Sequence, residues 1–286
     1  MSVSAASARR VALVTGGNKG IGFEIVRQLA AADPALTVLL GARDNARGEA
    51  SVKSLAALPR PLTNISPLHL DVTSPASIAA AASTVKSRYG RLDLLVANAG
   101  VFLKHGADHS ARGEDVDATF GVNYRGVRDC AAAFLPLMSP GARIVAVSSE
   151  LAHPALAGMS PSVRSRFAKA STVGEVDALV DEYRAAAVSS PDKRKDSGWS
   201  TSHYGVSKVA VCAWGRALAK TLAASAQAGV TVHTACPGWC ATDMSPGPRP
   251  AAEGAAMIVH VAQLAQEEAE KTNGEFWSNK KTTKVF

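Results

Sequence analysis

The chain has 286 residues, of which 47% are hydrophobic and 19% charged, a composition that excludes a disordered chain and allows a sizeable buried core. No apolar run reaches the roughly 18 residues that a membrane-spanning helix requires, and residues 1–10 lack the apolar core of a signal peptide. The net charge of +7 does not indicate nucleic-acid binding, because the basic residues are scattered. We therefore expect a cytoplasmic protein that binds neither membranes nor nucleic acids.

Short apolar runs alternate with helical stretches along the whole chain. This alternation is typical of a doubly wound α/β fold with a parallel sheet, so we expect one Rossmann-type domain over residues 1–286. The expected strands are Val11–Thr15, Thr37–Leu40, Leu68–Leu70, Leu92–Ala97, Arg143–Ser148, Val230–Cys236 and Glu275–Ser278. The expected helices include Ser74–Tyr89, Pro161–Ala170, Val173–Ala187 and Ser207–Ala224.

The first strand runs into a glycine-rich turn, GGNKGIG at residues 16–22, and a helix pattern follows. Glycines allow positive φ and close backbone approach, and a helix N-terminus presents free N–H groups to a pyrophosphate. The spacing of Gly16, Gly20 and Gly22 differs from the commoner GxGxxG fingerprint, and the turn lacks the Lys-Ser/Thr ending of a P-loop. By itself the motif is compatible with a dinucleotide site and with a tight turn that binds nothing.

A second motif places Tyr204 and Lys208 four residues apart in a helical stretch. At this spacing both side chains project from one helix face. A phenol has an ordinary pKa of about 10 and exchanges protons near neutrality only when a nearby positive charge favours the phenolate. Lys208 can supply that charge, although Tyr and Lys at this spacing are also common on ordinary helix surfaces.

Together these motifs resemble the short-chain dehydrogenase/reductase family. The resemblance continues in chain order through Asn98-Ala99-Gly100, Asn123, Ser148-Ser149 and Pro237-Gly238. Finer details resemble the carbonyl reductase branch of the family, which includes plant salutaridine and menthone reductases; these details are GGNKGIG, Ala42-Arg43-Asp44 and the segment 237–244. The resemblance spans Val11 to about Trp277. It implies the reduction of a small-molecule ketone, aldehyde or quinone with NADPH.

The choice of NADP over NAD also follows from charge. NAD-specific sites usually offer an acid after the second strand to the ribose 2′-hydroxyl, whereas a 2′-phosphate needs cations. Here Arg43 follows the second strand, Lys19 lies in the glycine turn, and Asp44 is expected to cap the next helix instead. The alternative for both cations is an ordinary solvated surface position.

The resemblance implies a set of cofactor contacts at the carboxyl ends of the strands. It places Asp71 near adenine, the 98–100 triplet near the ribose and nicotinamide, and Thr242 at the nicotinamide amide. The full set is Gly16, Asn18, Lys19, Gly20, Ile21, Gly22, Arg43, Asp71, Val72, Asn98, Ala99, Gly100, Tyr204, Lys208, Pro237, Gly238 and Thr242.

Four side chains are expected to carry the chemistry. Tyr204 gives the proton, and Ser149, as the second serine of its pair, hydrogen-bonds the same substrate oxygen. Lys208 lowers the pKa of Tyr204 and binds the nicotinamide ribose. Asn123 matches the family position that anchors a proton-relaying water.

The interval between Ser149 and Tyr204 departs from the general family, which has only a short loop there. Residues 150–203 are too many for a structureless loop in a compact domain, so we expect a helical insertion. In the carbonyl reductase branch such an insertion covers the faces through which relatives dimerise, which predicts a monomer. Glu150, Leu151 and Trp239 are expected to line the substrate pocket, although Glu150 can equally point to solvent.

Other readings of the chain remain. The same fold can serve as a catalytically silent NADP-sensing module. The densest basic cluster, residues 193–195, is expected to form a solvated face, with part of the positive charge attracting the cofactor. His105 and His109 have a metal-ligand spacing, but Gly106 favours a structural role, and no metal is expected. The four cysteines show no disulfide spacing and are expected to be reduced thiols.

Overall fold

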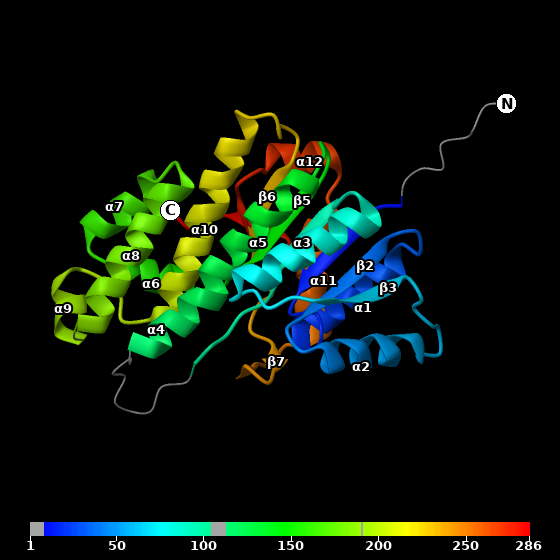
Figure 1. The fold of residues 1–286 in the computed structure, drawn as a ribbon. Coiled ribbons are helices and arrows are strands. Elements are labelled where there is room, and N and C mark those ends of the chain that lie inside the picture. Colours follow the sequence, from blue (N-terminus) through cyan, green and yellow to red (C-terminus); the bar gives the residue numbers. More distant parts are fainter. Residues whose placement is uncertain (1–8, 104–112, 190) are drawn as a thin grey trace.

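The computed structural model describes residues 9–103, 113–189 and 191–286. Most of the N-terminal leader and the His105/His109 pattern lie outside the described residues. The predicted fold class is confirmed, since the described residues form one domain with a sheet of eight strands between two layers of helices (Figure 1).

The sheet is parallel apart from one edge strand. Its order is β10-β9-β6-β5-β4-β1-β2-β3, and β10 pairs antiparallel with β9. Strands run outward in both directions from β1 and β4, so the carboxyl ends of these two strands flank the crevice where ligands bind in such sheets. The strand bounds are β1 Val11–Thr15, β2 Thr37–Ala42, β3 Ile65–His69, β4 Leu94–Ala97, β5 Arg143–Val147, β6 Thr231–Ala235, β9 Phe276–Ser278 and β10 Lys281–Thr283.

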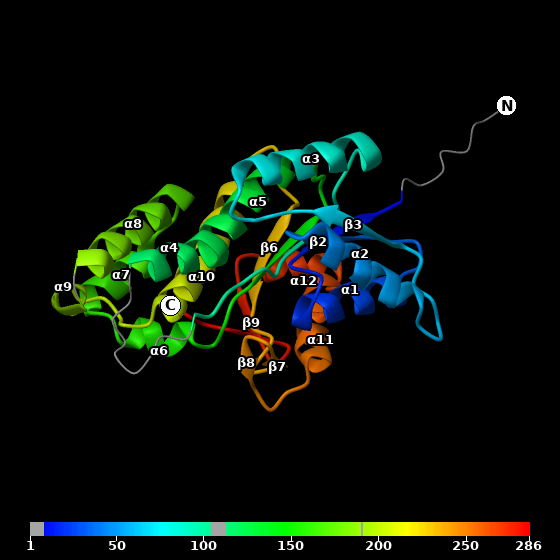
Figure 2. The ribbon, with the colours of Figure 1, turned by 60° about the horizontal axis from the view of Figure 1, so that its bottom comes forward.

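Helices cover both faces of this sheet. Figure 2 shows one layer formed by α1 (Gly20–Ala32), α2 (Asn45–Ala56), α11 (Ala251–Ala262) and α12 (Gln266–Lys271). The opposite layer contains α3 (Pro75–Tyr89), α4 (Gly113–Phe120), α5 (Gly126–Phe134) and α10 (His203–Ala223). The central strands are therefore buried on both sides, which is why their sequences read as continuous apolar runs.

Strand β1 shows how one strand serves both layers. Val11 and Leu13 belong to the hydrophobic core on the α10 side, whereas Ala12 and Val14 belong to the core on the α1 side. Successive side chains of a strand point to opposite faces, so this apolar run joins the two cores.

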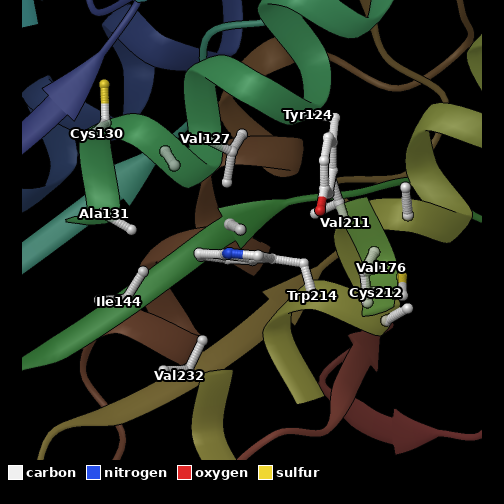
Figure 3. Packing of buried hydrophobic residues seen from close by; sticks show 14 of the residues in the cluster. Tyr124, Val127, Cys130, Ala131, Ile144, Val176, Val211, Cys212, Trp214 and Val232 are labelled. Atoms are coloured by element: carbon white, nitrogen blue, oxygen red, sulfur yellow. The ribbon is translucent and has the colours of Figure 1, made fainter. Parts of the chain in front are cut away.

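Packing around Trp214 holds α10 against the sheet. Its indole is 1% exposed and lies beside Ile144 of β5 and Val232 of β6, with Tyr124 and Val127 in the same cluster (Figure 3). A buried Trp makes a large contribution to packing. It fixes the helix that carries Tyr204 and Lys208.

Several boundaries differ from those predicted. Strand β3 begins at Ile65 and contains Pro67. Proline has no backbone N–H to donate, and an edge strand tolerates this because it pairs with a neighbour on one side only. Helix α10 begins at His203 because the Ser202 hydroxyl accepts a hydrogen bond from the Gly205 N–H (3.0 Å). Strand β10 and the small ribbon of β7 (Ala241–Thr242) and β8 (Ser245–Pro246) are not predicted from the sequence.

Four helices lie in the segment between Ser149 and Tyr204: α6 (Ala152–Ala157), α7 (Pro161–Lys169), α8 (Val173–Ser189) and α9 (Pro191–Asp196). They gather at the end of the molecule away from α2 (Figure 1). Aromatic contacts join them, because the Trp199 ring meets Phe167 and Tyr183 edge-on at 6.1 and 5.3 Å between ring centroids. These residues belong to the same core cluster as α10.

One prediction about this segment is wrong. Residues 193–195 do not form a wholly solvated face, because Arg194 is only 3% exposed. Its Nη1 donates to His203 Nε2 (3.1 Å), and His203 Nδ1 lies 2.6 Å from the Tyr183 hydroxyl. Arg194 thus connects α9 to the first residue of α10, a long-range contact that a local charge pattern does not indicate.

Candidate active site

The glycine turn between β1 and α1 forms a cradle of bare backbone. Gly16 and Gly20 have φ values of 63° and 55°, which favour glycine. A Cβ at Gly22 would lie 2.2 Å from the Gly16 carbonyl oxygen, so no side chain fits there. Helix α1 begins at Gly20 with no side-chain cap among the described residues, which leaves its first N–H groups for an anion.

Thr15 ties this cradle to the end of β4. Its hydroxyl oxygen accepts hydrogen bonds from the N–H groups of Asn98 (3.0 Å) and Ala99 (2.9 Å). The Asn98 amide Nδ2 donates to the Thr15 carbonyl oxygen at 3.0 Å. The predicted triplet that ends at Gly100 therefore lies against the glycine turn, although its members are more than 80 residues away in sequence.

Charged groups lie at the outer end of the cradle. Arg43 is exposed directly after β2, and Asp44 caps α2 as predicted, accepting from the Arg47 N–H (3.0 Å). Lys19 Nζ is 2.9 Å from Asp243 Oδ2 in an exposed ion pair. A phosphate that binds Lys19 therefore competes with Asp243.

Two predicted contacts follow β3. The Asp71 carboxylate accepts from the N–H and hydroxyl of Thr73, and these bonds, together with the charge of Arg43, lower the pKa of Asp71. The Val72 side chain is buried, and a Cβ at Gly126 would lie 2.9 Å from its Cγ2. Val72 can therefore face the crevice only through its backbone.

Tyr204 and Lys208 lie in the first turns of α10, at the carboxyl ends of β5 and β6. Lys208 is 3% exposed; its Nζ donates to the Val147 carbonyl oxygen (2.9 Å) and lies 5.4 Å from the centroid of the Tyr204 ring. Burial raises the pKa of Tyr204 to about 12, and the Ser149 hydroxyl lowers it in part. Burial lowers the pKa of Lys208 to about 8. At neutral pH, Tyr204 therefore carries its proton and Lys208 is mostly charged.

The two adjacent serines differ in their surroundings. Ser148 is buried; its hydroxyl donates to the Lys208 carbonyl oxygen (3.1 Å) and lies 3.1 Å from Cys212 Sγ. Ser149 is half-buried, and its hydroxyl oxygen accepts from the Leu151 N–H (3.2 Å). Of the two serines, only Ser149 lowers the pKa of Tyr204 by a hydrogen bond.

Asn123 is fully buried within a π-helical turn, Gly121–Arg125, which the sequence analysis does not predict. Its Oδ1 accepts from the Val101 N–H (2.8 Å), and its Nδ2 donates to the Val101 carbonyl oxygen (2.9 Å) and to Ser207 Oγ (3.2 Å). Asn123 therefore connects the loop after β4 to α10. Such π-turns often occur at functional sites.

Comparison with known proteins identifies the family. Residues 10–188 match the family model described as short chain dehydrogenase. The chain belongs to the short-chain dehydrogenase family. It is 36% identical over 281 residues to NADPH carbonyl reductase 1 of Pongo abelii, which covers 96% of the chain and 98% of the relative.

Solved structures give the same result for this short-chain dehydrogenase. Salutaridine reductase from Papaver somniferum superposes with a TM-score of 0.81 at 28% identity, covering 94% of this chain and 99% of that one. Menthone neomenthol reductase from Mentha piperita has a TM-score of 0.75 at 28% identity, with coverages of 94% and 98%. The resemblance inferred from the motifs is thus confirmed.

Exposed apolar side chains follow β4, β5 and β6 in this short-chain dehydrogenase. Leu151 is 48% exposed and Trp239 64% exposed, and the Trp239 indole donates to Ser245 Oγ (2.6 Å). Phe102, not predicted from the sequence, is 40% exposed, and its ring meets Tyr204 edge-on at 5.0 Å between ring centroids. The one sequence feature that could have indicated Phe102 is its position two residues after the 98–100 triplet.

Glu150 is turned toward the end of β9, where its carboxylate accepts a hydrogen bond from the Ser278 hydroxyl. Cys236 Sγ accepts from the N–H groups of Glu150 and Gly238, both at 3.3 Å, and burial raises the pKa of this thiol. Cys236 thus joins the loops that follow β5 and β6. With Cys130, Cys212 and Cys240 it is one of four buried free thiols.

The remaining predicted contacts follow β6. Gly238 has a φ of 82°, and a Cβ there would lie 2.3 Å from Arg249 Nη1, which donates to the Pro237 carbonyl oxygen (3.1 Å). The Thr242 methyl group faces Gly20, where a Cβ would lie 3.5 Å away. Thr242 is therefore next to the first turn of α1.

The described part of the chain has neither a membrane-spanning helix nor a cluster of metal-ligating side chains. No helix there combines the length and apolar character needed to cross a membrane. No group of three or more His, Cys, Asp or Glu side chains there is arranged to hold a metal ion.

Proposed function

We propose that this short-chain dehydrogenase reduces the carbonyl group of a ketone, aldehyde or quinone to an alcohol, with NADPH as cofactor and Tyr204 as proton donor. The observation that carries the proposal is the pair formed by half-buried Tyr204 and buried Lys208, 5.4 Å apart from ring centroid to Nζ, beside the Ser149 hydroxyl. The carbonyl reductase relative named above uses NADPH, as its name states.

The glycine cradle fits a dinucleotide. Its positive-φ glycines and the open N-terminus of α1 suit a pyrophosphate, and Arg43 and Lys19 suit a 2′-phosphate. The other residues proposed to hold the cofactor are Asn18, Ile21, Asp71, Val72, Asn98, Ala99, Gly100, Tyr204, Lys208, Pro237, Gly238 and Thr242. When bound, NADPH supplies the hydride for the carbonyl carbon.

Three side chains then stabilise the negative charge that develops on the carbonyl oxygen. Tyr204 keeps its proton at neutral pH, because burial raises its pKa to about 12, so it can donate that proton to the oxygen. Ser149 holds the same oxygen by a hydrogen bond. The phenolate that remains is stabilised by the positive charge of Lys208.

We propose that Asn123 has a positioning role. It holds Val101 and Ser207 by its amide group and so keeps the loop after β4 against the catalytic helix. Its expected role in anchoring a proton-relaying water remains a prediction.

We further propose that residues 150–203 form the insertion that shapes the mouth of the site, with Leu151 and Trp239 on its rim. Helices α6, α7 and α8 pack against α10 (Figure 1). Covered in this way, α10 is a poor dimerisation surface, so we expect a monomeric, cytoplasmic enzyme.

The decisive variant is Tyr204→Phe, which removes only the hydroxyl group. Loss of NADPH absorbance is followed with a panel of ketones, aromatic aldehydes and quinones, and NADPH binding is titrated by fluorescence. The variant is expected to lose about 10²- to 10⁴-fold in turnover with nearly unchanged NADPH binding, whereas Tyr89→Phe, at the far end of α3, keeps both.

Turnover retained by Tyr204→Phe contradicts the assigned role. If the unmodified protein binds NADPH but reduces none of the panel, the alternative of a silent NADP-sensing module is favoured instead.

A further inference from the structure

A cavity of about 440 Å³ lies between α6, which begins three residues after Ser149, and the segment 195–202, which ends two residues before Tyr204. This volume is within the range of about 300–1,000 Å³ that is typical of small-molecule pockets. Two of its lining residues are directly connected to the active site. The Leu151 N–H donates to Ser149 Oγ, and Ser202 caps the helix that carries Tyr204.

The cavity has two chemically different walls. The α6 wall is apolar and is formed by Leu151, Pro154, Ala155 and Gly158. The opposite wall presents an ammonium group, an indole and three hydroxyl groups, from Lys195, Trp199, Ser200, Thr201 and Ser202. None of the lining residues is an acid, and the nearby Glu150 carboxylate is engaged by Ser278.

The polar wall carries a positive charge and no negative one. Lys195 is exposed and brings an ammonium group, and Ser200, Thr201 and Ser202 bring hydroxyl groups that can donate to a carboxylate. The Trp199 indole contributes shape only, because it is 2% exposed. A contact between an ammonium group and a carboxylate is stronger than a hydrogen bond between neutral groups. A wall of this kind suits an anionic, acceptor-rich group.

We propose that this cavity binds the carboxylate arm of the substrate, so that the enzyme prefers keto acids in which an apolar chain joins the reacting carbonyl to a carboxylate. The apolar chain lies along α6, and the carboxylate faces Lys195 and the hydroxyl groups of residues 200–202. This inference rests on the proposed carbonyl reduction and specifies its substrate class.

The test compares each keto acid with its uncharged methyl ester. Benzoylpropionate, benzoylbutyrate and benzoylvalerate span increasing distances from carbonyl to carboxylate. For the best-fitting length, kcat/KM is expected to be about tenfold higher for the acid than for the ester, as for a charge-assisted contact. In Lys195→Met this ratio is expected to approach one. Lys169→Met, an exposed lysine of α7 outside the cavity, keeps the ratio of the unmodified enzyme.

Failure of this inference is distinguishable from failure of the proposed function. Esters reduced as efficiently as acids at every chain length, or a ratio that Lys195→Met leaves unchanged, overturn the carboxylate site while carbonyl reduction stands. If no compound is reduced, calorimetry measures the binding of each acid and its ester to the enzyme. Tighter binding of the acid, lost in Lys195→Met, supports the carboxylate site. Equal binding of acid and ester overturns it.

Discussion

Replacing Lys208 with Met tests whether its charge sets the acidity of Tyr204. Lys208 Nζ lies 5.4 Å from the centre of the Tyr204 ring, and Coulomb's law with an effective dielectric constant of about 20 gives about 3 kcal/mol for charges at that distance. This energy corresponds to roughly a hundredfold change in the ionisation constant of the phenol. Lys208→Met removes the positive charge, disfavours the phenolate and so raises the pKa of Tyr204.

Oxidation of the product alcohol with NADP reports this change, because Tyr204 must then accept a proton. At pH values below the pKa of Tyr204 the rate follows the ionised fraction, so the variant is expected to be about a hundredfold slower at pH 7. The rates of both enzymes should rise with pH through the neutral range, so the hundredfold ratio between them should persist there. Lys220→Met, on an exposed position of α10, controls for changes in the helix. Equal rates of Lys208→Met and the unmodified enzyme across this range refute the electrostatic role.

Other consequences of the structure can be measured independently. Arg43→Asp is expected to weaken NADPH binding about 10- to 100-fold more than NADH binding, because a charge-assisted phosphate contact becomes a repulsion; Arg47→Asp, one helix turn away, is the control, and an unchanged preference would show that Arg43 does not bind the phosphate. Burial lowers the pKa of His233 to about 3, whereas the unfolded chain takes up that proton below about 6.5. Stability should therefore fall with falling pH in this interval by about 1.4 kcal/mol per pH unit, and His233→Leu should be less acid-sensitive in urea titrations; equal sensitivity would exclude His233 as the cause. Sedimentation should give a mass near the 29.5 kDa of one chain, and a value near twice that would contradict the monomer.

Much of the fold could be predicted because its signals are local. The apolar run Val11–Thr15 and the glycine turn after it predict strand, turn and helix in the observed order. The cap at Asp44 is likewise local, since the acid and the N–H it accepts from are three residues apart. The edge strand β3 was less predictable, because Pro67 interrupts its pattern and only its place in the sheet makes the proline acceptable.

The candidate site also has some features that the sequence predicts and others that depend on the tertiary structure. The sequence alone determined the fold class, the family and the chemical types at the site, because strand periodicity, glycine geometry and the Tyr204/Lys208 spacing are properties of neighbouring residues. Only the tertiary structure decided that Phe102 packs on Tyr204, that Glu150 turns to Ser278 and that Arg194 is buried. The physical reason is that burial and hydrogen-bond partners depend on which distant segments pack together, and that packing sets the pKa values and the shape of the cavity.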